Sequence, residues 1–359
     1  MSPAASTTPP PLPLPARAAE IEALWGSRAQ ERAREVYTWM ALSRAMDARM
    51  QALQRQGRIG FYGAAMGHEA VNISAGLLTR PEDWIFPGLR EQLVALVRGH
   101  PIGAYVHHLF ATERDPARGR QMPCHPTARE VHYVSMSSVI GTQITHAAGA
   151  AFAMRRRREA AVALACFGDG ATSASDFHAG LNFAGVGRWP VVFLCANNQW
   201  AISMPAERQS AVERLSDKAS AYGFPGRTVD GTDLFAVWAE LARAIETART
   251  GGGPTLLEMR VFRMTPHSSS DDPSRYQPPD WSRRALEHDP VRRFVDWLDR
   301  VGWLTAPERA TIEQEADRRV REAIAEAERT PPPGPATLFE DVMASPTSPP
   351  RSSGGAGTG

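Results

Sequence analysis

The chain has 359 residues, 40 of them basic and 39 acidic, with a formal net charge of +1 and 43% hydrophobic residues. This length is enough for one large α/β domain or two smaller ones with a buried core. The balanced charge speaks against a nucleic-acid-binding or anionic-membrane-binding protein, and no apolar stretch reaches the roughly 18 residues that cross a bilayer.

The two ends of the chain have compositions typical of disorder. Residues 1–17 are rich in Pro and lack the pattern of an export or organelle signal. Residues 346–359 are rich in Ser, Gly and Pro. We therefore expect a disordered arm and a disordered tail on either side of one domain that covers residues 18–345.

Two long segments have helical spacing. Residues 29–56 form the first, and residues 306–328 form the second. The three consecutive prolines that begin at Pro331 end the second helix. Burial against the core and packing against partner subunits both fit these helices. The expected buried stripe of the first comprises Val36, Met40, Met46, Met50 and Leu53.

Cysteine and arginine usage indicate the setting of the protein. Cys124, Cys166 and Cys195 show neither metal-ligand spacing nor an even disulfide framework, which predicts reduced thiols and a cytoplasmic location. Lys218 is the only lysine among 40 basic residues, a bias typical of a GC-rich bacterial genome. The run Arg155–Arg158 follows an Ala-rich helical stretch and predicts a solvated helix end or, alternatively, a subunit contact.

Residues 161–198 combine two buried strands with a Gly-rich turn. The apolar run 161–167 predicts a strand of a parallel sheet, and residues 191–196 predict a second one. Gly168 and Gly170 flank Asp169, so a bulky anion can approach the backbone closely. A helix is expected next, capped by hydroxyls of Thr172, Ser173 and Ser175, and its N-terminal amides favour a phosphate.

The strand ends place two oxygen ligands together. Asp169 and Asn198 each follow one of the two parallel strands, so both leave the carboxyl edge of the sheet, where ligands of open α/β folds bind. Carboxylate and amide oxygens beside a phosphate cradle predict Mg²⁺ that bridges a diphosphate. The alternative is a solvent-facing Asp169 in an ordinary turn between strand and helix.

This pattern, GDG, a spacer of just under thirty residues and then NN, resembles the thiamine diphosphate motif. Over about residues 30–345 the chain is similar to the α subunit of the decarboxylase component of 2-oxo acid dehydrogenase complexes, and most of all to the branched-chain type. Six further segments carry this resemblance in the expected order: GRIGFYGAAMGHEA, FPGLREQ, GRQMPCH, VSMSSVIGTQITHAAGAAFA, VDGTDLFAV and PHSSSDDPSRY.

The resemblance implies an α/β thiamine diphosphate-binding fold, a mostly parallel sheet flanked by helices that forms the diphosphate-binding half of a site. It implies decarboxylation of a 2-oxo acid on thiamine diphosphate, whose ring stabilises a carbanion, and transfer of the acyl group to a lipoyl domain of the acyltransferase component. A separate β subunit would supply the other half of the site in an α₂β₂ heterotetramer.

The resemblance also assigns roles to residues. It implies that Asp169, Asn198 and the main-chain oxygen of Trp200 bind Mg²⁺, and that Arg90 pairs with the terminal phosphate, for which its planar fork is suited. A surface salt bridge is the alternative for Arg90. The remaining implied contacts are the amides of Gly168, Gly170 and Ala171 on the diphosphate, Ser138 and Ile140 on the cofactor, and Ser137, Thr142 and Gln143 on a structural K⁺.

His267 is the histidine to which the resemblance gives a catalytic role. It begins the polar segment HSSSDD, which we expect to be a flexible loop, and a histidine there can donate a proton near neutral pH. The resemblance implies that it lies at the mouth of the cofactor site and assists acyl transfer; the alternative is a solvated loop histidine. Ser268 aligns with a position that is phosphorylated in mitochondrial relatives. In a bacterial chain we do not expect this phosphorylation.

Several positions depart from the family pattern. Leu89 and Trp200 each replace a tyrosine of the family. Ala174 replaces a glutamate, Ala196 an arginine and Pro266 a histidine. Since the ligand set itself is intact, we expect weaker cofactor binding rather than inactivity. Pyruvate and acetoin dehydrogenase α subunits, and a non-catalytic scaffold paralogue, remain alternatives.

Overall fold

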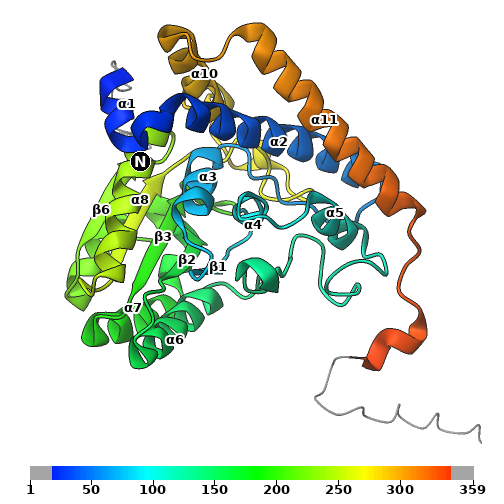
Figure 1. The fold of residues 1–359 in the computed structure, drawn as a ribbon. Helices are drawn as coiled ribbons and strands as arrows, with labels where there is room; N and C mark the ends of the chain where they lie inside the picture. The colour runs from blue at the N-terminus through cyan, green and yellow to red at the C-terminus, as the bar shows by residue number, and fades with distance from the viewer. Residues whose placement is uncertain (1–17, 341–359) are drawn as a thin grey trace, which may run out of the picture.

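The computed structural model describes residues 18–340, which form a five-stranded parallel sheet with helices on both faces (Figure 1). The predicted α/β fold with a mostly parallel sheet is therefore confirmed. The strands lie in the order β1 (Trp84–Phe86), β2 (Ala163–Gly168), β3 (Val191–Asn197), β7 (Thr255–Arg260) and β6 (Gly226–Asp230). The predicted arm and tail, and residues 341–345 of the predicted domain, lie outside the described residues.

The two strands predicted from residues 161–167 and 191–196 are β2 and β3. They pair in parallel with Gly168 opposite Ala196. Because the pair stays in register to its last residues, the chain leaves both strands at the same edge of the sheet. The segments that begin at Asp169 and Asn198 are thereby brought side by side.

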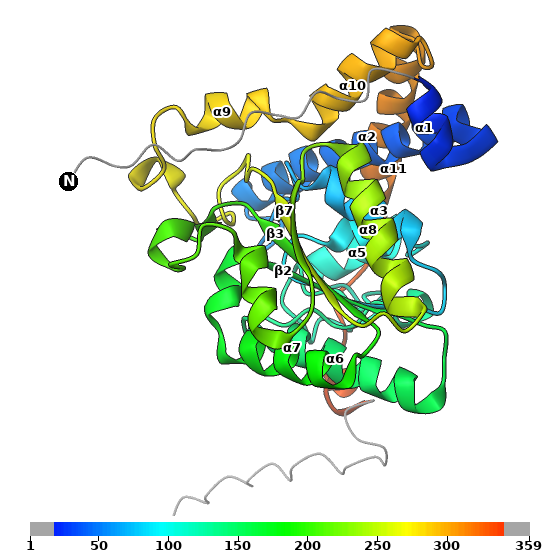
Figure 2. The same ribbon diagram turned by 90° about the vertical axis from the view of Figure 1, so that its left-hand side faces the viewer.

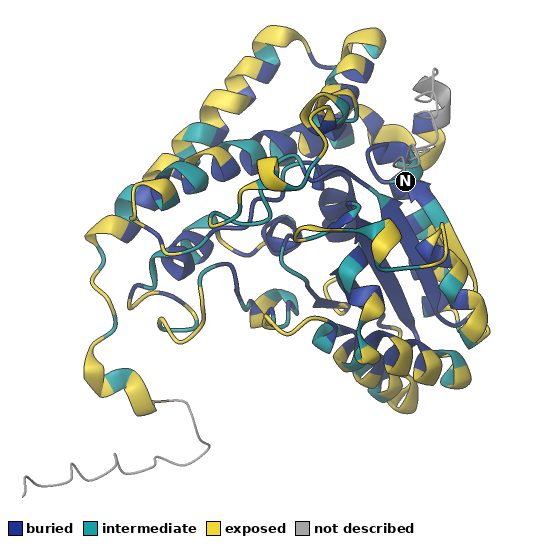
Figure 3. Ribbon diagram, turned by 180° about the vertical axis from the view of Figure 1, so that it is seen from behind, coloured by how far each residue is buried: buried dark blue, intermediate teal, exposed yellow. Residues whose placement is uncertain are grey.

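Alternating side chains of the strands fill two cores. Val192 and Leu194 of β3 pack towards α3 (Glu69–Leu78) and α8 (Leu234–Arg249). Phe193 and Cys195 pack towards α6 (Thr142–Arg157) and α7 (Ser175–Gly187) on the other face. Figure 2 shows α6 and α7 below the strands and α8 beside them, and Figure 3 shows the strands as the most continuously buried part of the fold.

The long helices α2 (Ala29–Arg55) and α11 (Ala306–Arg329) form a further layer and cross each other beyond α3 (Figure 1). The predicted stripe is confirmed, because Val36, Met40, Met46, Met50 and Leu53 are all buried. The other elements are α1 (Ala18–Trp25), α4 (Gln92–Val97), α5 (Ile102–Phe110), α9 (Trp281–Glu287), α10 (Pro290–Val301) and the short antiparallel pair β4 (Trp200–Ala201) and β5 (Met204–Pro205).

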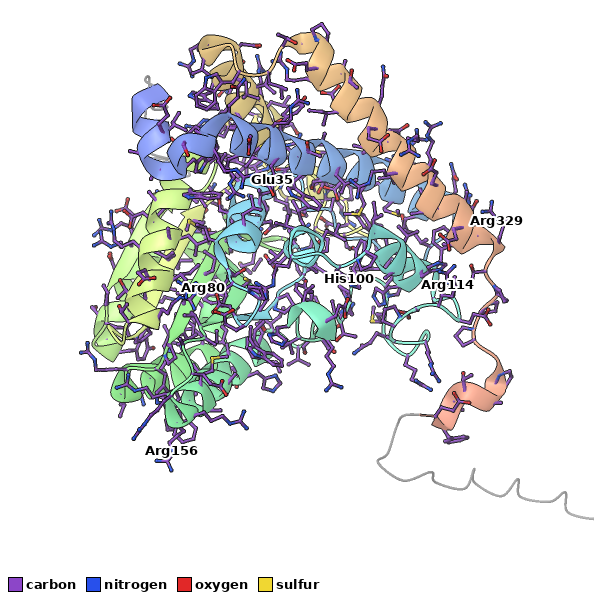
Figure 4. The ribbon with its side chains drawn as sticks, in the orientation of Figure 1. Glu35, Arg80, His100, Arg114, Arg156 and Arg329 are labelled. Carbon is purple, nitrogen blue, oxygen red and sulfur yellow. The ribbon has the colours of Figure 1, made fainter. Side chains whose placement is uncertain are left out.

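Three smaller predictions are also tested by the fold. The cysteines are free and buried. The residues of the run Arg155–Arg158 are exposed at the C-terminal end of α6, and Figure 4 shows Arg156 at the outer end of that helix. Within residues 18–340, no helix combines the length and apolar character needed to traverse a bilayer.

Candidate functional site

Asp169 and Asn198 lie together at the carboxyl edge of the sheet. Asp169 begins a 3₁₀ turn, Asp169–Ser173, directly after β2, and Asn198 follows β3. Both are buried, and the backbone amide of Asn198 hydrogen-bonds to the Asp169 carboxylate. The structure therefore brings together the two side chains predicted to bind Mg²⁺.

The Asp169 carboxylate lacks a strong partner. Burial raises its pKa to about 6, against the smaller effects of backbone amides and of the Arg263 charge. Its one side-chain hydrogen bond, from Gln209 Nε2 to Oδ2, is long at 3.4 Å. Because an ionised carboxylate is costly to bury, a bound cation would offset the unfavourable desolvation of this group.

The third predicted metal ligand, the main-chain oxygen of Trp200, faces Arg263. Arg263 Nη1 donates to this oxygen at 3.3 Å, and Nη2 donates to the oxygen of Ile202 at 2.9 Å. A carbonyl oxygen has two lone pairs, so this contact leaves one for a metal. The indole of Trp200 packs against Tyr276 and Trp281 in a small core, so the side chain itself has a structural role.

The Gly-rich turn is tightly packed. A Cβ on Gly170 would lie 2.7 Å from Cβ of Ala201, whereas one on Gly168 would meet only the oxygen of Ala196, at 4.0 Å. The backbone of Gly168 is thus accessible to a ligand, and Gly170 lets the turn approach the segment after Asn198. Ala171, the third residue predicted to offer its amide, is buried in the same turn.

The predicted capping of the following helix by hydroxyls is wrong. α7 begins at Ser175 after the N-cap residue Ala174, which makes no side-chain cap. The reason is the intervening 3₁₀ turn, inside which Thr172 Oγ1 donates to the oxygen of Asp169 at 2.9 Å. Any phosphate at this place would meet the amides of the 3₁₀ turn before those of α7.

Arg90 is buried at the same edge, with 5% of its surface exposed. Its Nη2 donates to the backbone oxygen of His267 at 2.7 Å, and its Nη1 donates to the oxygen of Ala64. Burial, and then the charge of Arg263, lower the pKa of Arg90 to about 10. The alternative of a surface salt bridge is therefore wrong, because the guanidinium is buried and its partners here are neutral carbonyls.

His267 lies next to Arg90, but its protonation differs from the prediction. Burial, and then the charges of Arg90 and Arg263, lower its pKa to about 4. Without a bound ligand the ring of His267 is therefore neutral at neutral pH, whereas the sequence led us to expect a proton donor in this range. Burial of the ring is the main cause, and the neighbouring guanidinium charges add to it.

The loop that His267 begins is also more constrained than predicted. The amide of His267 donates to Asp271 Oδ2 at 2.7 Å, and the amide of Ser269 donates to the oxygen of Tyr62 at 3.1 Å. The hydroxyl of Tyr276 donates to the same carboxylate at 2.5 Å. The bonds to Asp271 hold the loop together internally, and the bond from Ser269 to Tyr62 attaches it to the segment before α3.

Sequence reasoning missed the imidazole of His68 and the guanidinium of Arg263, which are buried near Arg90. His68 has 2% of its surface exposed, and neither of its ring nitrogens has a hydrogen-bond partner among residues 18–340. Burial, and then the charges of Arg90 and Arg263, lower its pKa to about 3. Asn72 joins His68 to Arg90: its amide donates to the oxygen of His68 at 3.0 Å, and its Nδ2 donates to the oxygen of Arg90 at 2.7 Å.

The residues at this edge fit a magnesium diphosphate. Arg90 and Arg263 are buried and repel each other, and the neutral ring of His68 beside them has an unpaired N–H that is suited to an oxygen acceptor. An anion among them would remove the repulsion, because opposite charge favours the protonated forms. Beside them, Asp169, Asn198 and the Trp200 oxygen offer the hard oxygen donors that Mg²⁺ prefers.

The residues predicted for K⁺ and one of the two predicted to contact the cofactor, Ser138, lie on a cavity of about 320 Å³ next to the start of α6. Ser137, Ser138, Thr142 and Gln143 all line it. Gln143 Nε2 donates to the oxygen of Cys166 at 3.1 Å, and Ser138 Oγ lies 2.5 Å from Nε2 of His125. Ile140 follows Ser137 and Ser138 closely in the sequence, and its side chain is 62% exposed.

One family departure has a visible local role. Leu89, which precedes Arg90, packs on Gly63, since a Cβ built on that glycine would lie 3.2 Å from its Cγ. An apolar side chain here holds the backbone of Arg90 against the segment before α3 without offering a polar contact.

The chain matches known proteins along most of its length. Residues 37–336 match the family described as dehydrogenase E1 component. The 2-oxoisovalerate dehydrogenase subunit alpha of Bacillus subtilis is 38% identical over 312 residues, which are 86% of this chain and 94% of that protein. The mitochondrial 2-oxoisovalerate dehydrogenase subunit alpha 2 of Arabidopsis thaliana is 36% identical over 322 residues, 89% of this chain and 68% of that protein. The Bacillus subtilis pyruvate dehydrogenase E1 component subunit alpha is 36% identical over 311 residues, 86% and 81% of the two chains.

Proposed function

The chain belongs to the dehydrogenase E1 component family, and we propose that it is the α subunit of a branched-chain 2-oxo acid dehydrogenase. With a β subunit, in an α₂β₂ heterotetramer, it decarboxylates a 2-oxo acid on thiamine diphosphate and transfers the acyl group to a lipoyl domain. The observation that carries this proposal is the meeting of buried Arg90, Arg263 and His68 with the oxygen donors of Asp169 and Asn198 at one sheet edge.

Bound thiamine diphosphate supplies a thiazolium ring that can hold the electrons released when CO₂ leaves, which no side chain can do. The residues of this chain would bind and orient it. Arg90, Arg263 and His68 would bind the diphosphate, and the amides of Gly168, Gly170 and Ala171 would contact its oxygens. Asp169, Asn198 and the Trp200 oxygen would hold Mg²⁺.

The remaining roles concern the region between cofactor and acceptor. Ser138 and Ile140 would contact the cofactor, and Ser137, Thr142 and Gln143 would bind K⁺ as a structural ion. His267, held beside Arg90, would orient the lipoyl acceptor and gain its proton only after the diphosphate has neutralised the neighbouring guanidinium groups. The three buried free cysteines suit the reducing bacterial cytoplasm as the proposed location.

A pyruvate-using enzyme is the second candidate, because a pyruvate dehydrogenase α subunit matches nearly as well as the 2-oxoisovalerate ones. A non-catalytic scaffold is the third. We disfavour it because the residues predicted for Mg²⁺ and the diphosphate lie near one sheet edge and include buried charged groups that would be costly without a ligand.

The test is turnover of the purified α and β pair with branched-chain 2-oxo acids, pyruvate and acetoin, using an artificial electron acceptor. We expect the highest kcat/KM with a branched-chain acid, and negligible decarboxylation by the α chain alone because it carries half of the site. Preference for pyruvate would favour the second candidate. A pair that binds no thiamine diphosphate would favour the scaffold, and robust activity of the α chain alone would contradict the proposed assembly.

A further inference from the structure

The cavity before α6 holds a hydrogen-bonded pair that the proposed function leaves without an explanation. Ser138 Oγ lies 2.5 Å from Nε2 of His125, and both residues line the cavity. Ser138 is exposed, whereas His125 has 4% of its surface exposed. The histidine therefore contacts the cavity mainly through the serine.

The other nitrogen of His125 fixes the tautomer of the ring. Nδ1 lies 3.0 Å from the backbone oxygen of Pro123. A carbonyl oxygen only accepts hydrogen bonds, so Nδ1 carries a proton. In the neutral ring Nε2 is then an acceptor, and the hydroxyl of Ser138 donates its proton to it. Ser138 consequently presents oxygen lone pairs, and no proton, to the cavity.

The backbone of His125 is also fixed by a hydrogen bond, on the side away from the cavity. Its amide donates to Nε2 of His108 at 3.1 Å, and Nδ1 of His108 lies 3.1 Å from Oδ1 of Asp115. Because Nε2 of His108 accepts, its proton is on Nδ1 and is donated to Asp115. His108 and Asp115 are both buried, so this support is shielded from water.

The turn that carries His125 adopts a conformation that most residues avoid. Cys124, which precedes it, has φ +64°, in the left-handed region that favours glycine. Such a residue persists only where the surroundings hold it. Its thiol accepts from the amide of Gly63 at 3.4 Å, and the hydroxyl of Tyr105 lies 3.9 Å from the same sulfur. The turn at Cys124, held by these contacts, keeps Nε2 of His125 within hydrogen-bond distance of the Ser138 hydroxyl.

We infer that His125 is a positioning residue that acts through Ser138: its Nε2 accepts the hydrogen bond of the Ser138 hydroxyl and so leaves this serine as a hydrogen-bond acceptor towards the cofactor or the 2-oxo acid. The inference rests on the proposed function for the ligand that Ser138 meets. The bond is present before any reaction, so its loss weakens binding of that ligand and leaves the chemical step unchanged.

The experiment is a double-mutant cycle on the α and β pair with Ser138→Ala, His125→Phe and the combination. Two constants are measured: Kd for thiamine diphosphate with Mg²⁺ by tryptophan fluorescence without substrate, and KM and kcat for the 2-oxo acid with an artificial acceptor. We expect each single change to raise Kd or KM about 3- to 10-fold, the range of one hydrogen bond. The double variant should be no worse than Ser138→Ala, and kcat should stay within about twofold.

Two further variants make the result decisive. His125→Gln places an acceptor oxygen near the position of Nε2, so it should retain most of the parent affinity, and it serves for the cycle if His125→Phe does not fold. His146→Gln changes an exposed histidine of the same cavity and should change neither constant. Effects of His125 and Ser138 that multiply, or a His125 variant equal to the parent, would overturn the inference while parent activity shows that the proposed function stands. A parent pair that binds no thiamine diphosphate would instead remove the proposed function, and the inference with it.

Discussion

Nη2 of Arg90 donates a 2.7 Å hydrogen bond to the backbone oxygen of His267 and lies 3.4 Å from Nδ1 of the same residue. One guanidinium therefore touches both the main chain and the ring of the proposed acyl-transfer histidine. A change at Arg90 should alter diphosphate binding and the position of His267 together.

The first prediction concerns Arg90. Arg90→Ala should weaken thiamine diphosphate binding by the α and β pair at least about 10-fold, since a charge-assisted hydrogen bond contributes about 1.5–3 kcal/mol. Arg90→Lys keeps the charge but loses the fork, so its affinity should lie between those of the alanine variant and the parent. Calorimetry measures both, with Arg156→Ala, at the exposed end of α6, as the control. Parent affinity in Arg90→Ala would exclude it from the site.

The second prediction separates function from stability at Asp169. Its pKa of about 6, raised by burial, lies above the roughly 3.9 of an unfolded Asp, so stability is lost as the pH rises from about 3.9 to 6 and the full loss remains at higher pH. Asp169→Asn should therefore raise the free energy of unfolding at pH 7.5, by up to about 3 kcal/mol, while magnesium-dependent binding of thiamine diphosphate falls about 100-fold or more.

Denaturant unfolding and calorimetry measure the two effects on the same preparation. Asp176→Asn, in the first turn of α7, is the control for cofactor affinity and should leave it unchanged, while the loss of its charge at the helix N-terminus should lower stability by at most about 1 kcal/mol. Unchanged cofactor affinity in the Asp169 variant would mean that the carboxylate does not bind the metal.

The third prediction concerns His68 and pH. Its folded pKa of about 3 lies below the roughly 6.5 of an unfolded histidine, so the unfolded chain binds the proton first and stability is lost as pH falls below 6.5. At pH 5 this loss is about 2 kcal/mol. Asp47 and Asp169, whose pKa values burial raises to about 7 and 6, act in the opposite sense and mask the slope of the whole protein.

The difference between His68→Gln and the parent isolates the effect. The free energy of unfolding of the variant minus that of the parent should be about 2 kcal/mol larger at pH 5 than at pH 7.5. A difference that does not vary with pH would show that His68 is not buried as a neutral ring. His146→Gln, at an exposed position, should give a pH-independent difference.

The fourth prediction concerns His267. His267→Ala should reduce acyl transfer to a lipoyl domain more than it reduces decarboxylation with an artificial acceptor, with a loss on the order of 10²- to 10⁴-fold for a general acid. Its proton should be available only with the diphosphate bound, because burial, and then the charges of Arg90 and Arg263, lower its pKa to about 4 in the chain itself. Equal rates of acyl transfer to the lipoyl domain in variant and parent would show that His267 has no role in the transfer.

The sequence predicted the part of the site that depends on neighbouring strands. Asp169 and Asn198 could be placed together because each follows an apolar strand in one short segment, and the in-register pairing of β2 and β3 confirms this. Arg263 follows β7, which pairs with β3 although some sixty residues separate them in the chain. No local pattern indicated that β7 would lie there, so its arginine was missed.

Protonation and tertiary pairing were beyond the sequence for a different reason. The pKa of His267 depends on the burial and the charges of Arg90 and Arg263, which come from different strand ends. His68 stands in a recognised segment, but nothing in its neighbours along the chain shows that its ring nitrogens lack partners. The bond between His125 and Ser138 joins two segments whose local patterns are unrelated.

The burial of Cys124, Cys166 and Cys195 has a practical consequence. Burial raises the pKa of the Cys124 thiol to about 12 and that of the other two well above the ordinary value, so reactive thiolates are scarce at neutral pH. Iodoacetamide should therefore leave this subunit largely unmodified while it alkylates the reduced lipoyl thiols of the proposed acceptor. Alkylation would then stop the reaction sequence at a chosen point, and the decarboxylating half could be studied within the intact complex.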